Sequence, residues 1–410
     1  MQPGADRARS RSILIGAAMM MTVAMGMRQS LGLFIGPVTH DLALTTADFT
    51  FAVAIQNISW GASQALVGAF ADRRGSRPVM MAGAVVYALG LAVMLMAHGL
   101  VALAISGGLI GIALSCTASS LAMSATARAV PESRRSATLG LVSAVGSLGT
   151  LVIAPMTQAT LSGMGWRVGV ALFVVLTLSL MLPAAFMAGG ADKLPARSGG
   201  NVSMKEVLGQ AMRHRGFLVM SGAYFVCGLQ LVFLTTHLPS YLALCGMDPM
   251  LSAEALATIG GVNCIGSWLF GWLGGKYPKH ILLGLLYILR SIALFAYFVV
   301  PPTPSSTLMF AAAMGMLWMG VMPLTSGLVA EMFGTRYMAT LLGISFMVHQ
   351  AGSFLGAWGG GLIYDAMGSY DRAWQIGVTV GVLAGAVQIL AGGPRRRRDG
   401  GMAEPAYATG

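Results

Sequence analysis

Long apolar runs alternate with short polar turns along the chain, from residue 13 to residue 392. An α-helix needs about 20 apolar residues to cross the hydrocarbon core of a membrane. A helix that is apolar on every side shows little amphipathic periodicity, so the pattern predicts how many helices there are better than where each one ends. We predict an all-α membrane protein with twelve transmembrane helices, at 13–36, 48–71, 78–97, 100–128, 135–161, 167–189, 216–243, 252–274, 280–300, 306–332, 337–364 and 372–392.

The longest polar interruption divides these helices six and six. It combines glycine, proline and serine with basic residues, a composition typical of a linker. The predicted domains are an N-terminal tail at 1–12, a six-helix half at 13–189, a linker at 190–215, a second six-helix half at 216–392 and a C-terminal tail at 393–410.

The two halves form a weak internal repeat. The Gly26–Arg28 segment precedes Gly68 by about the same distance as Gly228–Gln230 precedes Gly271. Two pseudo-symmetric six-helix halves are an architecture that many secondary transporters share. The repeat also places Gln230 at the position that corresponds to Arg28.

Basic residues are distributed unevenly between the two sides of the predicted bundle. With the N-terminus on the inner side, all but four of the 25 Lys and Arg residues fall in segments on that side. Arg167 and Arg372 lie in outer loops, and Arg28 and Arg290 lie within helices. The positive-inside rule then predicts a multi-pass membrane protein with both termini in the cytoplasm.

The composition fits a membrane protein and excludes several function classes. The chain is 56% hydrophobic and 10% charged, whereas average soluble proteins carry about 25% charged residues. The formal charge of +11 follows from the topology, so we expect no nucleic-acid partner. The four cysteines lack metal-ligand spacing, and no enzyme motif such as a phosphate-binding loop is present. We expect a monomer in the bilayer, without metal, cofactor or enzymatic activity, that runs on an ion or substrate gradient.

A basic turn between the second and third predicted helices carries the most specific motif. It reads Gly-Ala-Phe-Ala-Asp-Arg-Arg-Gly-Ser-Arg-Pro over 68–78. This stretch resembles the cytoplasmic signature between helices 2 and 3 of the major facilitator superfamily (MFS). The resemblance implies the twelve-helix MFS fold, alternating access and a cytoplasmic gate motif made of Gly68, Asp72, Arg73, Gly75 and Arg77.

The chain also resembles the monocarboxylate-porter-like bacterial branch of that superfamily. The resemblance rests on Gly26–Phe34 followed by Pro37, on Gln56–Asn57 with Trp60–Gly61, and on His349–Gln350 with Gly352 to Gly356. It implies a place in the bacterial inner (cytoplasmic) membrane. Animal monocarboxylate carriers have a basic residue on helix 1 at a place similar to Arg28. They also use an Asp and an Arg on helix 8, where this chain has Asn263 and Ser267. That charged pair, linked to proton-coupled lactate transport, is therefore missing, and neither substrate nor coupling can simply be transferred.

Two arginines are candidates because they lie within predicted helices. Arg28 lies near mid-membrane, where an arginine is costly unless it meets water, a partner or a ligand. Its planar guanidinium suits a carboxylate, so we predict substrate contact, with a structural pair as the alternative. For Arg290 a structural or gating role is favoured over substrate contact. No acidic residue is clearly at mid-membrane, and a cavity with positive charge alone favours an anion.

Two histidines are candidates for proton coupling, because imidazole titrates near neutral pH. His349 lies near mid-depth of the eleventh helix, and His237 lies near the outer end of the seventh. Asn57, Tyr224 and Gln230 are further candidates for substrate contact. Packing roles with hydrogen bonds between helices are the alternative for all five.

These observations lead to one hypothesis and two alternatives. The hypothesis is secondary active uptake of a small organic anion, a monocarboxylate, by proton symport with alternating access. Arg28 would hold the carboxylate, His349 or His237 would carry the proton, and Gln230 and Asn57 would orient the ligand. The alternatives are proton-driven efflux of drug-like or metabolite compounds, and a membrane sensor or scaffold that does not transport.

Overall fold

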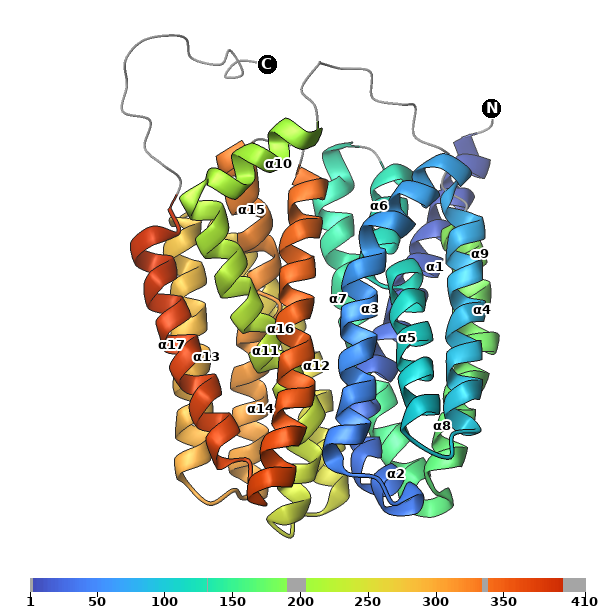
Figure 1. The fold of residues 1–410 in the computed structure, drawn as a ribbon. Helices are drawn as coiled ribbons and strands as arrows, with labels where there is room; N and C mark the ends of the chain where they lie inside the picture. The colour runs from blue at the N-terminus through green and yellow to red at the C-terminus, as the bar shows by residue number, and fades with distance from the viewer. Residues whose placement is uncertain (1–2, 131, 190–203, 334–337, 394–410) are drawn as a thin grey trace.

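The described part of the computed structural model, which comprises residues 3–130, 132–189, 204–333 and 338–393, is helical throughout and contains no strand. The helices run roughly along one axis, and α1 begins and α17 ends at the same end of the bundle (Figure 1). We call this end the termini end and the opposite end the far end.

The N-terminal half consists of helices that connect directly or through short turns. In chain order they are α1 (Pro3–Gln29), η1 (Ser30–Phe34), α2 (Ile35–Leu42), α3 (Thr46–Arg74), α4 (Ser76–Leu95), α5 (Leu100–Thr117), α6 (Ser119–Ala129), α7 (Glu132–Met164), α8 (Trp166–Leu176), η2 (Thr177–Met181) and α9 (Leu182–Ala188).

The C-terminal half has the same organisation. It comprises α10 (Met204–Arg213), α11 (Arg215–Leu244), α12 (Pro249–Gly274), α13 (Lys279–Val299), α14 (Pro304–Trp318), α15 (Val321–Phe333), α16 (Met338–Met367) and α17 (Asp371–Ala391). Four predicted spans are built from consecutive pieces, namely α1–η1–α2, α5–α6, α8–η2–α9 and α14–α15. With these joined, each of the twelve predicted spans corresponds to a helical segment.

Ten of these segments, within the described residues, are long and apolar enough to cross a membrane. The other two, α3 and α16, are equally long but more polar, because they carry Gln56, Asn57, His349 and Gln350 at mid-length. These two helices face each other across the boundary between the halves (Figure 1). Polarity inside a span is therefore concentrated where the two halves meet.

Each half is stabilised mainly by its own apolar core. In the N-terminal half, Phe34 packs edge-on against Phe173 at a centroid distance of 5.5 Å. In the C-terminal half, Phe233 packs in the same way against Trp374 at 4.8 Å. Close helix contacts depend on glycine, since a Cβ at Gly149 would overlap the carbonyl oxygen of Thr22 on α1.

The helix α10 occupies part of the segment that the sequence predicts as a linker. It lies across the termini end, and its apolar positions 204, 207, 208 and 211 recur with helical spacing (Figure 1). The ten residues are too few to cross a membrane. Composition alone therefore assigned them to the polar segment that contains them.

The halves are tightly joined at the far end. The Asp365 carboxylate accepts hydrogen bonds from the backbone N–H groups of Thr46, at 3.2 Å, and Ala47, at 2.7 Å. A carboxylate of α16 thus caps the N-terminus of α3, where the helix dipole favours negative charge. One turn deeper, Phe51 packs edge-on against Trp358 at 5.4 Å.

The halves separate toward the termini end. Along α3 and α16, close packing persists as far as Gly61, where a Cβ would meet the side chain of Gln350. Farther along, a Cβ at Gly68 or Gly343 would meet no atom of the described residues within 4 Å. In the part of the chain that the structure describes, the bundle is therefore closed at the far end and open at the termini end.

Candidate functional site

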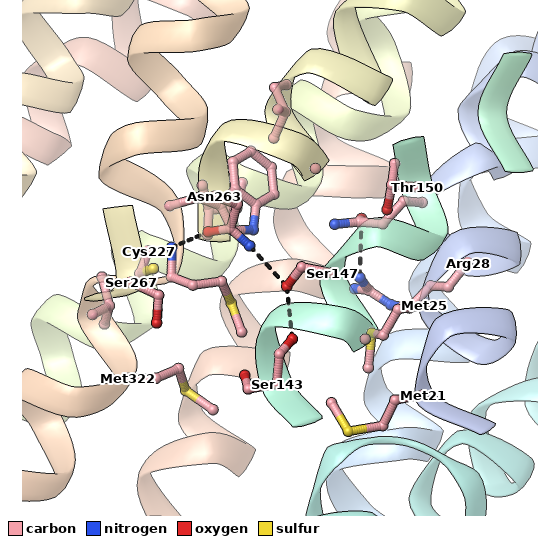
Figure 2. A pocket seen from close by; sticks show the side chains of 18 of the residues that line it. Met21, Met25, Arg28, Ser143, Ser147, Thr150, Cys227, Asn263, Ser267 and Met322 are labelled. Carbon is pink, nitrogen blue, oxygen red and sulfur yellow. Dashed lines mark hydrogen bonds between the residues drawn. The ribbon is translucent and has the colours of Figure 1, made fainter. Parts of the chain in front are cut away.

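A cavity of about 370 Å³ lies between the two halves. Its walls come from α1, α3, α6 and α7 on one side and from α11, α12, α14, α15 and α16 on the other. The lining reaches Thr235 toward the far end and Gly140 and Ser326 toward the termini end. Figure 2 shows Arg28 on one side of this space and Asn263 and Ser267 on the other.

Arg28 is half-buried at the cavity wall and has polar but uncharged partners. Its guanidinium donates to Asn57 Oδ1 at 2.8 Å and to Gln29 Oε1 at 3.3 Å, and it stacks on the Trp60 ring at 5.0 Å. Its Nε has no hydrogen-bond partner among the residues that the structure describes. Among the described residues, no carboxylate lies within ion-pair distance. The positive charge therefore faces the cavity without a counter-ion.

Local structure holds Arg28 in place. The residue is in the last turn of α1, and the chain then tightens into the 3₁₀ helix η1. Asn57 is fixed in turn, since its Nδ2 donates to the Val53 carbonyl at 2.8 Å. The guanidinium thus rests on an amide that has no freedom to rotate away.

His349 and Tyr224 form an aromatic wall opposite Arg28. The two rings lie 4.5 Å apart, and Phe346 stacks on His349 at 5.9 Å. Phe346 also contacts Trp60 edge-on at 5.1 Å, so an aromatic chain links the Arg28 side to the His349 side. His349 Nδ1 lies 3.1 Å from Gln350 Oε1, and Nε2 bonds to no described residue.

Arg290 is fully buried and lies behind the cavity wall. It donates to the carbonyl of Leu317 at 2.7 Å and to the sulfur of Cys227, a lining residue, at 3.3 Å. Leu317 and Trp318 end α14, where a positive charge stabilises the last carbonyls. Arg290 is not among the residues that line the cavity, and its contacts are to the end of α14 and to α11.

Asn263 stabilises the same break between α14 and α15. Its Oδ1 accepts from the backbone N–H of Met319 at 2.9 Å, and its Nδ2 donates to Ser147 Oγ at 3.2 Å. Pro323, which follows Met319 by four residues, has no N–H to continue the helical pattern. A break in a spanning helix beside the central cavity is typical of transporters.

Gln230 and His237 lie outside the cavity lining. Gln230 is buried and its Nε2 donates to Ser291 Oγ at 3.1 Å and to the Gly377 carbonyl at 2.8 Å. His237 is buried between Tyr370 Oη, at 3.2 Å from Nδ1, and the Ala357 carbonyl, at 2.7 Å from Nε2. Both side chains join helices of the C-terminal half, as the packing alternative expects.

The gate motif is described in part. Gly75 has φ +91°, a backbone conformation that favours glycine, at the turn between α3 and α4. Arg77 stacks on Phe186 at 4.4 Å and donates to its carbonyl at 3.2 Å, which ties α4 to α9. The side chains of Asp72 and Arg73 lie outside the described residues, so the proposed latch stays a prediction.

Several lining residues escaped prediction from the sequence. They are the indole of Trp60, the methionines Met21, Met25 and Met322, and the hydroxyls of Ser143 and Ser147. A methionine or serine in an apolar span carries no signal of its own, because most such residues pack against other helices.

Comparison with known proteins agrees with this architecture. A family model of the Major Facilitator Superfamily matches residues 15–357. The chain is 25% identical over 360 residues to the MFS-type transporter YcxA of Bacillus subtilis (strain 168), which covers 84% of this chain and 85% of that protein. It is 25% identical over 370 residues to Monocarboxylate transporter 13 of Rattus norvegicus, covering 89% and 84%.

A solved structure shows the same fold. It is a bacterial homolog of the human lysosomal transporter Spinster in an inward-facing, unoccupied conformation, with a TM-score of 0.70 over 95% of both chains and 14% identity. The family match covers most of the chain, and the twelve spans in two halves fit it. The chain therefore belongs to the Major Facilitator Superfamily and is a transporter, not an enzyme.

Proposed function

We propose that the protein carries an organic monocarboxylate together with a proton. The observation that supports this most is Arg28, a cation in the cavity wall whose partners among the described residues are amides and an indole. A substrate carboxylate would supply the missing negative charge and accept charge-assisted hydrogen bonds from the guanidinium. The similarity to a protein named Monocarboxylate transporter 13 supports the same substrate class.

His349 is the favoured proton carrier. Its Nδ1 lies within hydrogen-bond distance of Gln350 Oε1. Because an amide oxygen can only accept a hydrogen bond, Nδ1 carries the hydrogen and Nε2 has a free lone pair that can take up a proton. A proton on Nε2 would place a second positive charge near Arg28. A carboxylate between the two cations would stabilise both, so proton and substrate would each strengthen the binding of the other.

Transport would proceed by alternating access around this cavity. The positive-inside rule places the termini end in the cytoplasm, so the conformation described here would release substrate inside. In the opposite state, the Asp365 cap on α3 would break and the helices near Gly68 and Gly343 would close. The gate motif around Gly75 and Arg77 would then hold the cytoplasmic side shut.

The test is uptake of a labelled monocarboxylate into liposomes under an imposed inward proton gradient. We expect Arg28→Gln to abolish uptake, and Arg167→Gln, which removes an exposed charge outside the cavity, to leave it unchanged. The His349→Gln variant should no longer use the proton gradient to accumulate substrate against its own concentration gradient. It should still exchange labelled for unlabelled substrate across the membrane. Wild-type uptake by a monodisperse Arg28→Gln protein would refute the proposal. Outward movement of neutral compounds under the opposite gradient would favour the efflux alternative.

A further inference from the structure

We infer that the substrate is an elongated, amphipathic monocarboxylate with a second hydrogen-bonding group at the end remote from its carboxylate. The carboxylate binds at Arg28, an aromatic or branched apolar body fills the middle, and the remote group meets Ser143 and Ser267. This inference rests on the proposed function and refines its substrate class.

The size of the cavity excludes a good fit to the smallest acids. Its volume of about 370 Å³ lies within the range of about 300–1,000 Å³ that is typical of pockets for drug-sized ligands. An acid of two or three carbons bound at Arg28 would leave most of this space filled by water. Much of that water would face apolar side chains, which favours a larger ligand that displaces it.

The middle of the cavity is apolar and adaptable. Met21, Met25 and Met322 project into it (Figure 2), and Trp318 and Phe346 complete the wall. Methionine side chains are flexible and polarisable, and they make favourable contacts with aromatic rings. The wall between the polar ends therefore suits a ring or a branched hydrocarbon.

A second polar cluster lies away from Arg28, between α7 and α12. Ser147 Oγ accepts from Asn263 and donates to the Ser143 carbonyl, at 3.2 Å in each case (Figure 2). The hydroxyls of Ser143 and Ser267 line the cavity and bond to no described residue. Other hydroxyls in these helices, namely Thr157 and Thr160 on α7 and Thr258 on α12, donate to the carbonyl four residues earlier. Ser143 and Ser267 are thus available to a ligand.

The separation of the two polar ends follows from helix packing. Met21 contacts Gly146, and Thr22 Oγ1 donates to the Val145 carbonyl at 2.9 Å, so this level of α1 lies beside Ser143. Arg28 follows Met21 by seven residues, a rise of about 10 Å between their Cα atoms toward the far end. A ligand that contacts both Arg28 and Ser143 would therefore carry a ring or several carbons between its carboxylate and its second polar group.

A matched ligand series tests this inference on the full-length protein in nanodiscs. The probes are propionate, 3-phenylpropionate, 3-(4-hydroxyphenyl)propionate and the neutral 3-phenylpropionamide, with affinity measured by calorimetry. We expect 3-phenylpropionate to bind at least tenfold tighter than propionate, and the hydroxyl to add a further threefold or more. A Ser143→Ala/Ser267→Ala double variant should lose only the advantage of the hydroxyl.

The outcomes separate the inference from the proposed function. Equal affinity for propionate and 3-phenylpropionate would overturn the elongated substrate and leave a carboxylate site intact. No advantage for the hydroxylated probe on the wild-type protein would overturn the second polar contact, even if the double variant fails to fold. Equal binding of the amide and the carboxylate, unaffected by Arg28→Gln, would refute the proposed function itself.

Discussion

Arg28 and Arg290 are both arginines in the middle of membrane-spanning helices, one in each half, and they have different surroundings. Arg290 is fully buried, and its guanidinium bonds to the carbonyls of Leu317 and Trp318 where α14 ends. Arg28 is half-buried, rests on Asn57 and Trp60, and faces the cavity. A charge inside a membrane helix is therefore informative only with its partners: helix-end carbonyls indicate a structural role, whereas a charge facing the cavity indicates a ligand.

The largest effect is expected from Arg28→Gln. Removing one partner of a close charge pair costs about 2–5 kcal/mol, so carboxylate affinity should fall about 30-fold or more. The thermal stability of the empty protein should change little, because Arg28 faces the cavity. Calorimetric titration and a melting curve of the same sample measure both. A large loss of stability with retained affinity would contradict this prediction and indicate a structural role for Arg28.

Arg290→Gln should show the opposite pattern. It leaves the Leu317 and Trp318 carbonyls without their donor, and a buried unsatisfied polar group costs about 1–3 kcal/mol. The melting temperature should fall, while the folded fraction binds carboxylate within about threefold of wild type. A tenfold loss of affinity at unchanged stability would place Arg290 in the site. The two variants should be assayed in one detergent at one protein concentration.

Asn57→Leu tests how far Arg28 depends on its support. Loss of the hydrogen bond to Asn57 Oδ1 should allow the guanidinium to move, and a charge-assisted bond is worth about 1.5–3 kcal/mol. We expect about tenfold weaker carboxylate binding and no effect on binding of a neutral analogue. Equal weakening for both ligands would instead indicate a general change in cavity shape.

Cys227→Ala should have the smallest effect. The thiol is a weak acceptor for Arg290, which keeps its carbonyl partners. Stability should fall by less than about 1 kcal/mol, near the central tendency for a single mutation, and substrate affinity should stay within about threefold. Chemical denaturation and ligand titration measure the two quantities. A strong loss of affinity would indicate that Arg290 contributes to substrate binding.

The sequence predicted the fold because its signals are strong and local. Apolar runs of about 20 residues give the spans, and the motif around Gly75 agrees with the family. The short helix α10 escaped because it does not span the membrane. The conformation of the molecule also lies beyond the sequence, since the far-end contacts of Asp365 depend on how two halves dock.

The candidate site was predictable only in part. The sequence predicted four residues that lie at or beside the cavity, namely Arg28, Asn57, Tyr224 and His349. They were predictable because charged and hydrogen-bonding groups are unfavourable inside a membrane unless they have a partner or a ligand. Burial of the Gln230 amide in the membrane is just as unfavourable, and hydrogen bonds to Ser291 and Gly377 on neighbouring helices offset it. No residue-level rule separates these cases, since the difference is which face of each helix points inward. The uncharged lining residues, such as Met21 and Ser267, are not unfavourable in a membrane span, so the sequence does not distinguish them from packing residues.

The lone positive charge at Arg28 has an electrical consequence for the empty protein. A unit charge moved through a membrane potential gains about 2.3 kcal/mol per 100 mV. The positive-inside rule predicts that the termini end lies in the cytoplasm. An inside-negative potential would then draw the unloaded site toward that end, which is the open end among the described residues. A bound carboxylate would neutralise that charge, so the membrane potential would no longer favour either orientation of the site. The voltage across the membrane would then hold the empty carrier facing the cytoplasm and limit how fast it returns.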